Sequence, residues 1–112
     1  MKRNNTYDDI DYLFAVVSRR DKLVQLAEEC CELGQAALKL TRALEPTGSP
    51  TPVSPEEAEQ ALLEEVADVL LCLQVTGYLC AAAARPRIIG KIETQKAERW
   101  VQRIKEKGAT DQ

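Results

Sequence analysis

The sequence predicts an all-α fold, a four-helix bundle of one short and three long helices that oligomerisation completes. Three observations predict it: apolar residues recur every three or four positions, strand-like alternation of useful length is missing, and glycine and proline are rare outside one segment. At 112 residues the chain predicts one domain over 1–112. Helices of this length have apolar faces that one copy only partly covers, so self-association is expected.

The first two helices are expected at about 8–18 and 21–45. Asp21 is the expected N-cap of the second helix. Its expected apolar face comprises Leu23, Leu26, Ala27, Cys30, Leu33, Ala37, Leu40 and Leu44. Residues 46–55 contain four prolines, so a Pro-rich loop is expected there, either as a lid over a substrate or as surface decoration.

A third helix is expected to begin after this loop and to run towards Ala84. Ser54 as N-cap, Pro55 at the first helical position and Glu57 three residues after Ser54 form a capping box. Residues 69–84 carry no charge, but the stretch is shorter than the roughly 18–20 residues that span a bilayer. It is interpreted as a helix in a bundle or dimer core, and no membrane partner is expected.

A fourth, amphipathic helix is expected from the boundary at Pro86 to about Lys107, where Gly108 ends it. The net charge of −3 provides no basic field, so nucleic acid is not an expected partner. The N-terminal segment has no apolar run typical of a signal peptide, so a cytoplasmic location is predicted.

Residue types restrict the chemistry that the chain can perform. Four cysteines occur without a C-x-x-C pair, and the chain contains no histidine. This composition excludes the usual zinc sites and catalytic groups that depend on histidine. Acid–base chemistry is therefore left to carboxylates, lysine, tyrosine or water.

Two acidic segments stand in the middle of the second and third expected helices. They are Glu28-Glu29-Cys30-Cys31-Glu32 and Glu64-Glu65-Val66-Ala67-Asp68. Residues three apart, such as Glu29 and Glu32, or Glu65 and Asp68, project on one side of a helix. No lysine or arginine lies three or four positions from any of these acids, so the like charges have no cationic neighbours on their own helix.

The simplest interpretation is that these acids form solvated helix faces. However, Glu65 and Asp68 lie among mostly apolar residues, so at least one is expected to border the core. An unpaired ionised carboxylate in such a place is strongly unfavourable. A hard divalent cation that prefers oxygen ligands, Mg²⁺ or Mn²⁺, would relieve the repulsion between the acids, and two ions fit their charge better than one.

The E-E-x-x-E and E-x-x-D patterns on successive helices resemble the signature of the all-α nucleoside triphosphate pyrophosphohydrolases, the MazG-like and dimeric dUTPase-like enzymes. The resemblance extends over most of the chain and includes residues 67–71 and 96–100. It implies Mg²⁺-dependent cleavage of an NTP or dNTP to the monophosphate and pyrophosphate. The interval from Glu32 to Glu65 is long for the family, and the aromatic-His pair of phosphoribosyl-ATP pyrophosphohydrolases is missing.

The resemblance also implies roles for individual residues. The implied metal ligands are Glu29, Glu32, Glu65 and Asp68. Glu28 is implied either behind these ligands or as the base that activates water, and Glu64 has no assigned role. The implied phosphate-binding residues are Lys96, Arg99 and, more weakly, Lys91, although these cations could equally solvate the last helix.

The expected assembly is a homodimer or a homotetramer built from two dimers. An alternative function from another class is a non-catalytic helical module, whose acidic stripe meets a basic partner or which binds a nucleotide without cleaving it.

Overall fold

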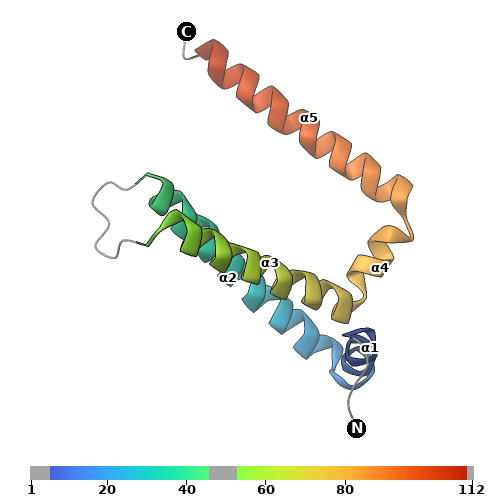
Figure 1. Ribbon diagram of the computed structural model, residues 1–112. Helices are drawn as coiled ribbons and strands as arrows, with labels where there is room; N and C mark the ends of the chain where they lie inside the picture. The colour runs from blue at the N-terminus through green and yellow to red at the C-terminus, as the bar shows by residue number, and fades with distance from the viewer. Residues whose placement is uncertain (1–5, 46–52, 111–112) are drawn as a thin grey trace. The chain divides into compact units, whose positions relative to one another are not determined.

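The computed structural model describes residues 6–45 and 53–110, and all regular structure in these two ranges is helical (Figure 1). The helices are α1 (Thr6–Val16), α2 (Arg19–Leu44), α3 (Pro55–Thr76), α4 (Tyr78–Ala83) and α5 (Pro86–Thr110). The predicted all-α class is confirmed. Most of the predicted Pro-rich loop, residues 46–52, lies outside the described residues.

The chain divides into two compact units, Met1–Leu79 and Cys80–Gln112, and each is described by itself. The first contains α1, α2 and α3, and the second contains α5. One domain over 1–112 stays a prediction. Within the described ranges, no helix combines the length and the apolar character needed to cross a bilayer.

Serine caps the N-termini of both long helices of the first unit. The Ser54 Oγ accepts a hydrogen bond from the backbone N–H of Glu57 at 3.1 Å, which confirms the predicted start of α3. The predicted N-cap of α2 was wrong, because the helix begins at Arg19 and the Ser18 Oγ accepts from the backbone N–H of Asp21 at 3.1 Å. Asp21 instead lies in the first turn, where the positive end of the helix dipole stabilises its negative charge.

The predicted single helix towards Ala84 was also wrong, because it is interrupted at Gly77. This residue has a φ of 82° in the left-handed region, where it caps α3, and the short α4 follows. A Cβ atom at Gly77 would lie 3.1 Å from the Phe14 Cε2 atom, so α1 also leaves little room for a side chain. At the other end of the chain, α5 begins at Pro86 as predicted but continues through Gly108 to Thr110.

α2 and α3 run antiparallel and side by side, and α1 packs on α3 (Figure 1). The more buried residues of α2 follow an alternating spacing of four and three, which is typical of paired helices. They are Lys22, Leu26, Glu29, Leu33, Ala36, Leu40 and Ala43. In α3 the same spacing runs through Ala58, Leu62, Glu65, Val69 and Cys72, and residues 73–76 at the end of the helix are also partly buried. We call these two rows the seam of the α2–α3 pair.

Polar contacts bind the start of α2 to its neighbours in the first unit. The Lys22 ammonium donates to the carbonyl oxygen of Phe14 and lies 4.2 Å from the centroid of the Phe14 ring. The Arg19 guanidinium donates to the Tyr78 hydroxyl at 3.2 Å. These contacts bring the end of α1, the start of α2 and the residues after α3 together around Gly77.

Replacing Gly77 with alanine is expected to lower the free energy of unfolding by about 1 kcal/mol or more, because a left-handed backbone strains a residue with a Cβ atom. Gly90→Ala is the control, since a Cβ atom there meets no other atom within 4 Å and alanine favours the helix interior. Urea unfolding followed by circular dichroism measures both variants. Equal stability of Gly77→Ala and the wild type would contradict the proposed role of Gly77.

Candidate metal centre

Two acidic side chains occupy positions of the seam that are otherwise mostly apolar. Glu29 stands between Leu26 and Leu33 in the four-three spacing of α2, and Glu65 stands between Leu62 and Val69 in that of α3. Both glutamates are half-buried. The helix periodicity that directs leucine and valine towards the partner helix therefore directs these two carboxylates there as well.

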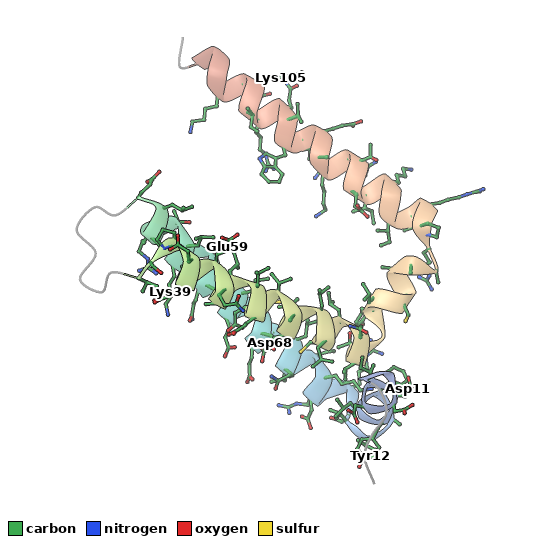
Figure 2. All side chains as sticks on the ribbon, viewed as in Figure 1. Asp11, Tyr12, Lys39, Glu59, Asp68 and Lys105 are labelled. Atoms are coloured by element: carbon green, nitrogen blue, oxygen red, sulfur yellow. The ribbon has the colours of Figure 1, made fainter. Side chains whose placement is uncertain are left out.

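Glu29, Glu65 and Asp68 come together between the two helices. Each offers one carboxylate oxygen, and these three oxygens lie within 4.8 Å of one another. We call these residues the acidic triad. Asp68 is exposed, and Figure 2 shows it in the middle of the α2–α3 pair, away from both ends. The structure thus joins three of the four predicted ligands, from two helices.

The oxygen atoms of the triad are incompletely satisfied by the protein. The Oε2 atoms of Glu29 and Glu65 are both shielded from solvent, and neither has a hydrogen-bond partner among the described residues. The other oxygen of Glu29, Oε1, accepts a hydrogen bond from the Gln25 side-chain amide at 2.8 Å. A shielded carboxylate oxygen without a donor is unfavourable, so a hydrogen-bond donor or a cation at this point would stabilise the two atoms.

The electrostatic environment of Glu29 also disfavours its negative charge. Desolvation raises the pKa of the Glu29 carboxyl group above its ordinary value, and the negative charges of Glu32 and Asp68 raise it further. The hydrogen bond from Gln25 partly opposes this shift. Desolvation and the nearby charges of Glu29 and Asp68 also raise the pKa of the Cys72 thiol.

The donor set of the triad fits a hard divalent cation. Carboxylate oxygens are the ligands that Mg²⁺ and Mn²⁺ prefer, and Mg²⁺ is commonly held by only a few carboxylates, its other ligands being waters and phosphate oxygens. A cation among Glu29, Glu65 and Asp68 would offset their mutual repulsion. The two shielded Oε2 atoms belong to two of these three residues.

The other predicted site residues lie outside the triad. Glu32 is exposed, although its charge is near enough to Glu29 to affect the pKa of that group. Glu28 and Glu64 are exposed on α2 and α3. The predicted phosphate-binding residues Lys91, Lys96 and Arg99 are exposed on α5, in the second unit. The roles predicted for all these residues stay predictions.

Sequence reasoning did not select two residues that border the triad, Gln25 and Cys72. Gln25 lies one helical turn before Glu29, which is the spacing of a side-chain pair on one helix face. Cys72 lies one turn after Asp68. Their spacing from the acids could have indicated both, but glutamine and a lone cysteine give no signal of their own.

Comparison of the chain with protein-family models, with curated proteins and with solved structures found no match.

The raised pKa of Glu29 predicts how stability depends on pH without metal. The folded protein holds this proton more tightly than the unfolded chain, so the contribution is full below about pH 4.5 and is lost as pH rises through the folded pKa. We therefore expect Glu29→Gln to raise the melting temperature at pH 7 in chelator-treated buffer, and the gain to shrink below pH 4.5.

Thermal unfolding between pH 4 and 8 measures this difference. Glu28→Gln is the matched control, because Glu28 is an exposed neighbour on the same helix. A Glu29→Gln variant that is no more stable at pH 7 than the Glu28→Gln variant would show that the charge of Glu29 does not destabilise the folded chain.

Proposed function

We propose that this protein is a Mg²⁺-dependent nucleoside triphosphate pyrophosphohydrolase, which converts an NTP or dNTP to the monophosphate and pyrophosphate. The observation that carries the proposal is the convergence of Glu29, Glu65 and Asp68, with two shielded carboxylate oxygens that lack a donor. The resemblance of the two acidic motifs to those of the MazG-like enzymes supports the choice of substrate and reaction.

In this proposal Glu29, Glu32, Glu65 and Asp68 would hold Mg²⁺, or Mn²⁺ in its place. When bound, the divalent ion supplies positive charge that stabilises the phosphate oxygens as the bond to pyrophosphate breaks. Lys96 and Arg99, with Lys91 as a weaker candidate, bind phosphate oxygens of the substrate. Exposed cationic side chains are suited to this role because a substrate can reach them.

Glu28 is the proposed general base. The chain contains no histidine, so a carboxylate is the natural acceptor for the proton of the attacking water. The water oxygen forms a bond to the α-phosphorus, the bond from the α-phosphorus to the bridging oxygen breaks, and pyrophosphate leaves with that electron pair. Glu28 neighbours Glu29 in the sequence, and its side chain is exposed.

A second copy of the chain completes the fold in this proposal, as a homodimer or as a tetramer of two dimers. Of the apolar side chains in the described residues, only Ile10, Ala36 and Ala58 are buried. By contrast, Leu38 of α2 and Leu63 of α3 are 63% and 58% exposed. Self-association would cover such residues and supply a core that one copy does not form. The cytoplasm, where nucleoside triphosphates and Mg²⁺ are plentiful, is the proposed location.

The function is tested by incubating the protein and Mg²⁺ with a panel of NTPs and dNTPs and measuring pyrophosphate and orthophosphate. We expect pyrophosphate as the primary product, and we expect Glu65→Ala to abolish its release. Glu64→Ala is the matched control and should retain activity, because Glu64 is exposed and lies outside the triad. Orthophosphate as the primary product would contradict attack on the α-phosphorus.

The same pair of variants separates the enzyme from a non-catalytic helical module. A ligand that binds only the folded state raises its stability, so Mg²⁺ should raise the melting temperature of the wild type and of Glu64→Ala but not of Glu65→Ala. A Glu65→Ala variant that is more stable than the wild type both with and without Mg²⁺ would favour the helical module.

Self-association is tested by sedimentation at micromolar concentration. We expect the wild type to sediment at twice the chain mass of 12.5 kDa or more, and Leu63→Glu to shift it towards the monomer because a charge would enter the covered face. Gln60→Glu adds the same charge on the same helix at a polar position and should leave the mass unchanged. A 12.5 kDa wild type would contradict the proposed assembly.

A further inference from the structure

Gln25 is a neutral residue that forms a hydrogen bond with one member of the acidic triad, Glu29. Its side-chain Nε2 donates a hydrogen bond to the Glu29 Oε1 atom at 2.8 Å, one helical turn along α2. The second oxygen of the same carboxylate, Oε2, is shielded and has no partner among the described residues. The two oxygens of Glu29 therefore have different environments, one satisfied by the protein and one not.

The hydrogen bond to one oxygen of Glu29 restricts the orientation of its carboxylate group. A glutamate side chain has three rotatable bonds, and its terminal torsion is broad, so without a partner the carboxylate samples several orientations. A donor fixed on Oε1 restricts this rotation. It leaves Oε2 as the oxygen of Glu29 that no protein donor engages, and the Glu65 Oε2 atom is likewise shielded and without a partner among the described residues.

We propose that Gln25 is a positioning residue, which orients the Glu29 carboxylate so that its Oε2 atom meets a divalent cation in the triad. The inference rests on the proposed metal-dependent function and extends it by one residue. Hydrogen-bond donors that orient ligating carboxylates change metal affinity by roughly ten-fold or more when removed. An amide is suited to this position because it donates to the carboxylate without a charge that would repel the cation.

The chain contains a matched pair that separates positioning from simple helix stabilisation. On α5, the Gln102 Nε2 atom donates to the Glu106 Oε1 atom at 3.1 Å, with the same four-residue spacing and the same exposed setting. Glu106 is not part of the triad. Loss of either glutamine amide removes one such helix pair, but only loss of the Gln25 amide releases a proposed metal ligand.

The test compares the wild type with Gln25→Met and Gln102→Met, using Mn²⁺ as the probe. Methionine keeps the length and the helix preference of glutamine but has no N–H donor. Binding is followed by the electron paramagnetic resonance signal of free Mn²⁺, and pyrophosphate release is measured as a function of Mn²⁺ concentration. Circular dichroism confirms that the variants remain helical.

We expect Gln25→Met to weaken Mn²⁺ binding about ten-fold and to raise the KM for Mn²⁺ by a similar factor, with kcat at saturating Mn²⁺ within about two-fold of the wild type. Gln102→Met should match the wild type in both measurements. This pattern would show that the Gln25 amide acts on the metal ligand and not on the amount of folded enzyme.

Other outcomes overturn the inference in distinguishable ways. Wild-type protein that binds no Mn²⁺ would remove both the proposed function and the role of Gln25. If the wild type binds Mn²⁺ and Gln25→Met binds it equally well, the function stands and the positioning role is wrong. A lower kcat with an unchanged KM for Mn²⁺, or an equal loss in Gln102→Met, would indicate a structural effect alone and would also reject it.

Discussion

Two carboxylates lie where a helix pair would normally place apolar side chains, and the burial of their charges is the main constraint on the α2–α3 pair. Glu29 and Glu65 occupy corresponding rows of the α2–α3 seam, and Asp68 brings a third negative charge to the same point. No cation stands three or four residues from these acids on either helix. The packing that joins α2 to α3 therefore also forces like charges together, and that conflict is relieved most simply by a bound cation.

A seam interrupted by acids contributes less apolar burial, and its buried members, Ala36 and Ala58, are small. Other contacts then help to hold α1, α2 and α3 in place. They include the serine caps at the starts of α2 and α3 and the contacts of Arg19 and Lys22 around Gly77. The helices are thus aligned while like charges remain unpaired between them, and such an arrangement lowers the stability of the fold.

Much of the helical fold was predictable because its signals are local. The Ser54 cap, the Pro86 boundary and the helix periodicity all act within a few residues. The interruption at Gly77 was not predictable in this way, because the approach of Phe14 from α1 is a tertiary contact. Only part of the α2 side of the seam was predicted. The pattern of apolar residues placed Cys30 on the inner face of α2, whereas the four-three spacing through Leu26 and Leu33 places Glu29 there. The meeting of α2 and α3 acids followed from the motifs, but the Gln25 contact required side-chain coordinates.

The central claim is that Glu29, Glu65 and Asp68 share a divalent cation. Diffraction from crystals soaked in Mn²⁺, recorded near the manganese absorption edge, tests it most directly because the anomalous signal locates the ion without reference to activity. The account predicts an anomalous peak within coordination distance of about 2–2.5 Å of oxygens from all three residues. A map from saturated crystals with no peak between α2 and α3, or with a peak bound only by other residues, would contradict it.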